Sequence, residues 1–151
     1  MGAPSDKHYD VLVNQHVEMV NLNRSHPSIL MWSMGNESLK FKEYFKQASE
    51  TVKQLDPSRP RIFSQWGPDA DEGTLEITNH HYPGPEGPDK YRHYKRPVTF
   101  DEFCHLNAYN RLELAADPGL RNMWGKLLDA MWNDMYHSQG VLGGAIWVGI
   151  D

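Results

Sequence analysis

Cysteine is nearly missing from this 151-residue chain, and so are the signals that would assign it a location. The single cysteine, Cys104, excludes an internal disulfide and leaves the redox compartment open. No apolar run approaches the ~20 residues of a membrane-spanning helix. The segment MGAPSDKHYD lacks both the basic and the apolar region of a signal peptide. We therefore expect no membrane partner, and localisation stays unknown, with a secreted or periplasmic parent protein still open.

Clustered positive charge is also lacking. The chain carries 15 Lys and Arg against 20 Asp and Glu, which gives a net charge of -5. Binding to nucleic-acid phosphates needs basic clusters, so we expect no nucleic-acid partner. The hydrophobic content of 39% is enough for a domain with a core. The aromatic content of 11% fits either core packing or stacking on sugar rings.

Helical and strand patterns alternate along the chain. Apolar periodicity and capping residues predict helices over residues 5–22, 39–55 and 117–140. Short apolar or β-branched runs predict strands over residues 28–34, 61–66, 75–82, 96–103 and 143–150. The run at 28–34 is so apolar that we expect it to be buried on both faces. This order is typical of an α/β fold with parallel strands.

The number of strands leaves two architectures open. A complete (β/α)₈ barrel needs ~250 residues, and this chain offers about five strands. The chain is therefore either a smaller open α/β sheet or the later part of such a barrel.

Polar side chains stand where the predicted strands end. Glu37 follows the first strand, the pair His80 and His81 precedes Tyr82 at the end of the third, and Glu102 ends the fourth. In parallel α/β folds, reactive groups gather at the carboxyl ends of strands. Two carboxyl groups at neighbouring strand ends are what glycoside hydrolysis requires, because one protonates the leaving oxygen and the other attacks or activates water.

Simpler interpretations exist for the same residues. A glutamate after a strand is often an ordinary loop residue. The histidines His80, His81 and His105 could suggest a metal, but they lack a helical HExxH pattern or a tight spacing, so we expect neither a metal site nor a cofactor.

Three motifs resemble glycoside hydrolase family 2, the family of β-galactosidases and β-glucuronidases. NRSHPSILMWSMGNES resembles its acid/base segment, RPVTFDEFCH its nucleophile segment, and GGAIWVGID its last barrel strand. The resemblance runs from about Asn21 to Asp151. It implies that residues 1–151 form part of a catalytic TIM barrel, roughly strands 4 to 8, an incomplete (β/α)₈ fold without the N-terminal strands and accessory β-sandwich domains.

The resemblance also implies roles for individual residues. Glu37 would be the general acid/base and Glu102 the nucleophile of a retaining exo-glycosidase, and the two carboxyl groups would lie ~5–5.5 Å apart. Tyr82 would hydrogen-bond the nucleophile, and Asn36 would bind the sugar 2-hydroxyl. The residues implied to bind substrate are Asn36, Tyr82, His105 and Trp147.

The implied substrate is a carbohydrate, with a β-galactoside as the leading expectation and β-glucuronidase or β-mannosidase specificity as alternatives. Two further hypotheses treat the chain by itself. It is an inactive domain fragment that self-associates through exposed barrel edges, or it is a carbohydrate-binding remnant that keeps Tyr82 and Trp147.

Overall fold

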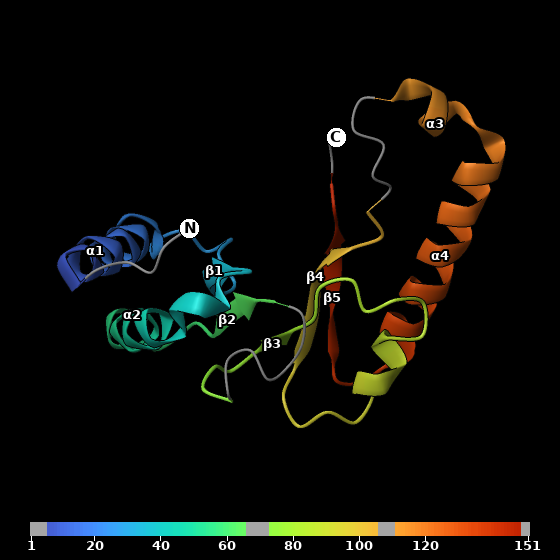
Figure 1. Ribbon diagram of the computed structural model, residues 1–151. Helices are drawn as coiled ribbons and strands as arrows, with labels where there is room; N and C mark the ends of the chain where they lie inside the picture. Colours follow the sequence, from blue (N-terminus) through green and yellow to red (C-terminus); the bar gives the residue numbers. More distant parts are fainter. Residues whose placement is uncertain (1–5, 66–72, 106–110, 149–151) are drawn as a thin grey trace. The chain divides into compact units, whose positions relative to one another are not determined.

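The structure is a computed structural model that describes residues 6–65, 73–105 and 111–148. The chain divides into two units, Met1–Thr78 and Asn79–Asp151, and each is described here by itself (Figure 1). In the described residues the strands form a two-stranded sheet, β1-β2, and a three-stranded sheet in the order β3-β4-β5.

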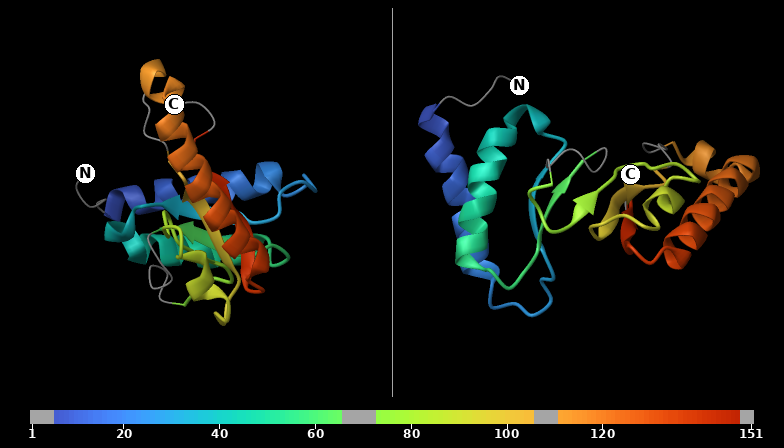
Figure 2. Two further views of the ribbon diagram at one scale, coloured as in Figure 1. Left: turned by 90° about the vertical axis from the view of Figure 1, so that its right-hand side faces the viewer. Right: turned by 90° about the horizontal axis from the view of Figure 1, so that it is seen from below.

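The first unit packs two helices against a small parallel sheet. Its elements in chain order are α1 (Asp6–Asn23), β1 (Trp32–Asn36), the 3₁₀ turn η1 (Leu39–Phe41), α2 (Lys42–Leu55) and β2 (Arg61–Ser64). Strands β1 and β2 are parallel. Helices α1 and α2 lie side by side in Figures 1 and 2. The buried core consists of Val20, Trp32, Met34, Tyr44, Ala48, Val52, Phe63 and Leu75.

The first predicted strand differs from its expectation in length and in burial. It begins at Trp32 instead of residue 28, and its residues alternate, with Trp32 and Met34 buried and Ser33 exposed. Leu30, just before it, is 73% exposed. The prediction that this strand is buried on both faces is therefore wrong for the described residues. One face of β1 packs on the helices. In the part of the chain that the structure describes, Ser33 and Leu30 are exposed.

A buried arginine fixes the start of β2. Arg61 is 2% exposed, and its guanidinium donates to Glu76 at 2.9 Å, to Ser49 Oγ at 2.7 Å and to Glu50 at 3.2 Å. Burial opposes ionisation of Glu76, but hydrogen bonds from Arg61 and from Lys53 outweigh it and lower its pKa to about 2. Charged hydrogen bonds of this kind hold the segment before β3 against β2.

The second unit packs one long helix against the three-stranded sheet. Its elements are β3 (Thr78–Asn79), which begins in the first unit, the 3₁₀ turn η3 (Pro88–Tyr91), β4 (Val98–Phe103), α3 (Leu112–Ala116), α4 (Pro118–His137) and β5 (Val141–Ile146). Strands β4 and β5 are parallel. The core consists of Tyr91, Val98, Phe100, Phe103, Cys104, Met131 and Met135.

Local chemistry explains where α4 begins and why β5 contains glycine. The Asp117 carboxylate accepts a hydrogen bond from the backbone N–H of Leu120 at 2.8 Å, which confirms the predicted N-cap before Pro118. A Cβ on Gly144 would lie 2.3 Å from the Phe100 carbonyl oxygen. Only glycine therefore allows β5 to approach β4 this closely.

The α/β class and the parallel pairing predicted from the sequence are confirmed. Helix α3 and the turn η3 were not predicted.

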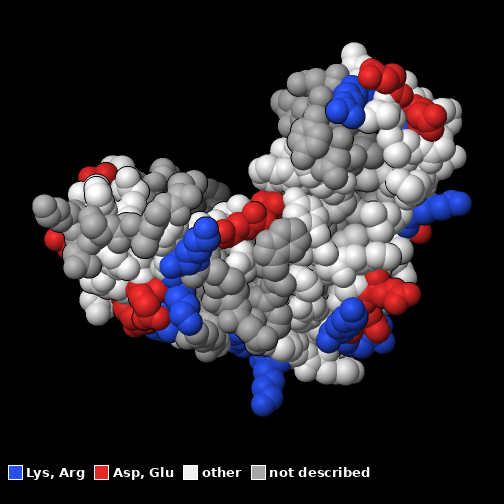
Figure 3. Space-filling view, in the orientation of Figure 1, with Lys and Arg blue, Asp and Glu red and all other residues white. Residues whose placement is uncertain are grey.

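Among the described helices none is both long and apolar enough to cross a membrane. On the face drawn in Figure 3, basic and acidic side chains stand next to one another. Leu142 and Ile146 of β5 are 57% and 42% exposed. Two expectations stay predictions. One is that the chain self-associates through exposed barrel edges, and the other is that residues 1–151 form one partial barrel domain.

Candidate active site

Glu37 stands directly after β1, where the backbone is tied to the neighbouring strand. Its backbone N–H donates to the Ser64 carbonyl at 2.9 Å, and Asn36 pairs with Ser64 in the parallel ladder. The Ser38 hydroxyl donates to the Asn36 carbonyl at 2.7 Å. The φ angle of Glu37 is 46°, in the left-handed region that non-glycine residues rarely adopt. The main chain thus turns sharply at this residue, and the side chains of Asn36 and Glu37 are exposed.

The glycine of the motif MGNE is required by packing. A Cβ on Gly35 would lie 2.7 Å from the Phe45 ring of α2 and 3.0 Å from the Phe63 ring of β2. Both rings pack in contact with each other, 4.9 Å between centroids. From the side of α1, His16 Nε2 lies 3.0 Å from the Met34 carbonyl. His16 therefore helps to fix β1.

Residues 56–60, DPSRP, hold the start of β1 in place. The Asp56 carboxylate accepts hydrogen bonds from Ser58 Oγ at 2.5 Å, Arg59 Nη1 at 2.6 Å and the buried Trp32 Nε1 at 3.0 Å. Arg59 Nε also donates to the Ile29 carbonyl at 2.8 Å. The bond from Ser58, followed by those from Arg59 and Trp32, holds the pKa of Asp56 well below its usual range in spite of burial. The approach to Glu37 is therefore anchored at both ends.

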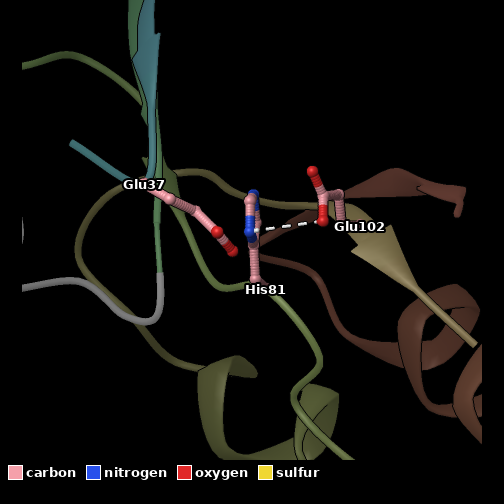
Figure 4. A group of neighbouring side chains, drawn as sticks. All are labelled: Glu37, His81 and Glu102. Atoms are coloured by element: carbon pink, nitrogen blue, oxygen red, sulfur yellow. Dashed lines mark ion pairs between the residues drawn. The ribbon is translucent and has the colours of Figure 1, made fainter. Parts of the chain in front are cut away.

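Glu102 lies on β4, where Tyr82 binds it through both side chain and backbone. The Tyr82 hydroxyl donates to Glu102 Oε2 at 2.7 Å, and the Tyr82 N–H donates to the Glu102 carbonyl at 2.8 Å. The Glu102 side chain is only 13% exposed. Nδ1 of His81 lies 3.7 Å from the same Oε2 atom, as the dashed line in Figure 4 marks. The predicted hydrogen bond between Tyr82 and Glu102 is thus present.

Asp101 shares the His81 ring with Glu102. His81 Nε2 lies 2.9 Å from Asp101 Oδ1, and His81 is fully buried. Asn79 Nδ2 donates to the same Asp101 oxygen in a short hydrogen bond and to the Thr99 carbonyl at 3.2 Å. The β4-β5 ladder is irregular between Phe100 and Phe103. In a regular strand the side chains of Asp101 and Glu102 would point to opposite faces. Because the end of β4 is irregular, both carboxylates approach the His81 imidazole.

His80 has a different partner from His81. The Tyr91 hydroxyl lies 2.6 Å from His80 Nδ1, and the two rings pack edge to face, 5.6 Å between centroids. Burial lowers the pKa of His80, and the nearby Lys90 and His81 lower it further. A neutral imidazole accepts a hydrogen bond from the Tyr91 hydroxyl, so the half-buried His80 is paired with a side chain of its own unit.

The remaining predicted residues lie just beyond strand ends. His105 is half-buried and stands two residues after β4. Trp147 follows β5, is 43% exposed, and its backbone N–H donates to the Phe103 carbonyl at 3.0 Å. Cys104, which precedes His105 in the chain, is buried, and burial raises the pKa of its thiol. The substrate-binding roles of Asn36, His105 and Trp147 stay predictions.

Three strand-end residues share an uncommon backbone conformation that the sequence did not reveal. The φ angles are 46° at Glu37, 47° at Tyr82 and 53° at Cys104. Non-glycine residues in this region carry strain that is characteristic of functional sites. Glu37 belongs to the first unit and Glu102 to the second, so the ~5–5.5 Å separation expected of a retaining pair stays a prediction.

A family model described as "Glycosyl hydrolases family 2, TIM barrel domain" matches residues 3–140. The chain belongs to this family. Its described strands and helices are accordingly part of a (β/α)₈ barrel, as expected from the motifs, although they form two small sheets and not a closed barrel.

Proteins similar to this chain carry different names. A β-glucuronidase of Paenibacillus borealis is 31% identical over an alignment of 121 residues, and the match covers 64% of this chain and 20% of that protein. A β-galactosidase of Lactococcus lactis is 36% identical over 76 residues, 50% of this chain and 7% of that protein. The solved structure of a β-galacturonidase from Eisenbergiella tayi bound to galacturonate gives a TM-score of 0.73 at 20% identity and covers 93% of this chain and 29% of that one. At that identity the likeness shows the fold alone. The chain spans less than a third of each protein.

Proposed function

We propose that the protein containing these residues is a retaining β-glycosidase in which Glu102 is the nucleophile and Glu37 the general acid/base. The observation that carries the proposal is the hydrogen bond from Tyr82 to Glu102 in a chain of glycosyl hydrolase family 2. The bond from Tyr82 occupies Oε2 and so orients the carboxylate, leaving Oε1 to attack.

The reaction proceeds in two displacements. Glu102 Oε1 attacks the anomeric carbon and forms a glycosyl ester while the bond to the leaving oxygen breaks and Glu37 gives that oxygen its proton. Water then enters, Glu37 accepts its proton, and attack at the anomeric carbon releases Glu102. Each glutamate ends the cycle in the protonation state in which it began. Asn36, one residue before the acid, binds the 2-hydroxyl of the sugar.

The sugar is best supported as a hexuronic acid. The Paenibacillus borealis relative, aligned over 121 residues, is named a β-glucuronidase. The β-galactoside expected from the motifs has weaker support, from the Lactococcus lactis relative over half of the chain. The proposed substrate is therefore a β-glucuronide, with a β-galactoside as the second candidate.

The test compares three substrates and three variants in the complete polypeptide that contains residues 1–151. We expect turnover of 4-nitrophenyl β-D-glucuronide to exceed that of the matching β-D-galactoside and β-D-galacturonide. Glu37→Gln and Glu102→Gln should each lower kcat by about 10²–10⁴-fold, and azide should restore turnover to Glu102→Ala. The exposed residue Glu113 supplies the matched control, because Glu113→Gln should change nothing.

A covalent label identifies the nucleophile independently. A 2-deoxy-2-fluoro glycoside of the preferred sugar should inactivate the enzyme, and peptide mass spectrometry should find the sugar on Glu102. Normal turnover in both glutamate variants, or a label on another residue, would refute the assignment. Assay of residues 1–151 alone, with size-exclusion chromatography, decides between a working chain and the inactive or sugar-binding alternatives.

A further inference from the structure

Strand β3 and the segment that follows it present three side chains to two adjacent carboxylates. Asn79 donates to Asp101, His81 lies against both Asp101 and Glu102, and Tyr82 donates to Glu102. All five residues belong to the second unit, so the arrangement does not depend on where the first unit lies. Glu102 and Tyr82 are explained by the proposed mechanism, whereas Asp101 and His81 are not.

The geometry orders these contacts into a chain of support. His81 Nε2 lies 2.9 Å from Asp101 Oδ1, the distance of a close ion-pair contact. A ring in contact with a carboxylate at this distance is held in place on that side. The other nitrogen, Nδ1, then faces Glu102 Oε2 at 3.7 Å. Figure 4 shows the His81 ring beside the Glu102 carboxylate.

We propose that Asp101 and His81 form a positioning pair that holds the Glu102 carboxylate in its attacking orientation. This inference rests on the proposed function of Glu102. Asp101 lies against His81, and the His81 ring lies beside Oε2, the same Glu102 oxygen that Tyr82 binds, so the carboxylate is held at that oxygen while Oε1 is left to attack. Neither residue touches the reacting carbon. Asp101 is itself held by Asn79, which makes the support rigid.

Burial adds a second argument. His81 is 0% exposed, while the Asp101 side chain is 31% exposed. If the His81 ring only filled space, an apolar ring would serve equally well. Burying a polar ring costs free energy unless polar partners compensate it. An imidazole between two carboxylates can hold one of them in position. The position of Glu102 matters because a 1 Å displacement of a reacting group can cost about 10²-fold in rate.

The experiment measures kcat and KM of the complete polypeptide on its preferred 4-nitrophenyl glycoside. His81→Phe keeps the ring and removes both nitrogens, and Asp101→Ala removes the group that holds the ring. Each should lower kcat by about 10-fold to 100-fold with KM changed less than about threefold. Asp101→Asn keeps a polar group of the same size beside His81 Nε2 and should recover most of kcat. The exposed residues His93 and Asp129 give the controls His93→Phe and Asp129→Ala.

The double variant separates positioning from a structural role. If the two residues act as a unit, His81→Phe with Asp101→Ala should be no slower than either single variant. The rate of inactivation by the 2-deoxy-2-fluoro glycoside, which reports the attack by Glu102, should fall in parallel. If His81→Phe does not fold, Asp101→Ala and Asp101→Asn test the inference at a partly exposed position.

Two results would overturn the inference while leaving the proposed function intact. One is full kcat in Asp101→Ala and His81→Phe when Glu102→Gln is inactive. The other is losses that multiply in the double variant and appear in thermal unfolding but not in the inactivation rate. Full turnover in Glu102→Gln would instead refute the proposed function and this inference together.

Discussion

Asp56 offers the sharpest test of how the strand before Glu37 is held in place. Its carboxylate is the common acceptor for Ser58, Arg59 and the indole of Trp32, the first residue of β1. The side chain is only 6% exposed. Asp56→Ala removes this acceptor and leaves the donors in place, so we expect the first unit to lose stability.

The size of the loss follows from what each donor keeps. Trp32 is 3% exposed, so its Nε1–H stays buried without a partner, which costs about 1–3 kcal/mol. Arg59 retains the carbonyls of His26 and Ile29, and at 18% exposure it is partly hydrated, so its loss is near 1 kcal/mol. We expect Asp56→Ala to lower the free energy of unfolding of the first unit by about 3 kcal/mol at pH 7.

The effect should depend on pH with a defined sign. The pKa of Asp56 in the folded chain lies below its ordinary value of ~3.9. Above pH ~4 both folded and unfolded chains are ionised at this residue, and the stabilisation is complete. Below pH ~4 the unfolded chain takes up a proton that the folded chain does not. The difference between parent and variant should therefore shrink by up to ~1.4 kcal/mol for each pH unit below pH ~4.

The assay is urea unfolding at pH 7 and at pH 3, read by hydrogen-exchange mass spectrometry of peptides from β1 and α2. These peptides report the first unit without requiring that the whole chain unfold in one step. Asp10, exposed on α1, gives the matched control Asp10→Ala. A loss under ~0.5 kcal/mol at pH 7, or equal losses at the two pH values, would refute the reasoning.

Three further predictions concern Gly35, Tyr82 and Asp117. Gly35→Ala should destabilise the first unit by about 1–3 kcal/mol in urea unfolding, because its Cβ overlaps the Phe45 ring. Tyr82→Phe should lower kcat by about 10-fold to 100-fold with intact folding by circular dichroism, since a hydrogen bond to a charged group such as Glu102 contributes about 1.5–3 kcal/mol. Asp117→Ala should cost about 1 kcal/mol of stability through loss of the α4 cap, without changing kcat.

Helices were predictable where local chemistry decides them. The pair Asp117 and Pro118 indicated the start of α4, and the carboxylate caps the helix as expected. Strand β3 was predicted over 75–82 but spans only Thr78–Asn79. Beyond it, His80 and Tyr82 keep single backbone hydrogen bonds to Thr99 and Glu102, and Tyr82 takes a left-handed conformation. β-Propensity indicates which residues fit into a strand. It does not indicate where the chain changes to another backbone conformation, as it does at Tyr82.

The two adjacent histidines have partners that the sequence does not predict. From the sequence we expect neither His80 nor His81 to bind a metal, and no partner is assigned to either. In the structure His80 contacts Tyr91, whereas His81 contacts Asp101 and Glu102. Alternation along an extended segment predicts that neighbours face opposite ways, so the different surroundings were foreseeable. The identity of the partners was not, because Asp101 lies 20 residues further along the chain and approaches only through the irregular end of β4.

The two glutamates are held by different means, and this has consequences for mutations around them. Glu37 is placed by its main chain, through Ser64, the close packing at Gly35 and the anchored start of β1. Glu102 is placed by side chains, above all by Tyr82 and the His81 ring. Substitutions around Glu37 should therefore lower stability together with turnover. Substitutions around Glu102 should lower turnover in a protein that remains folded, because the bonds they remove hold a carboxylate and not the chain.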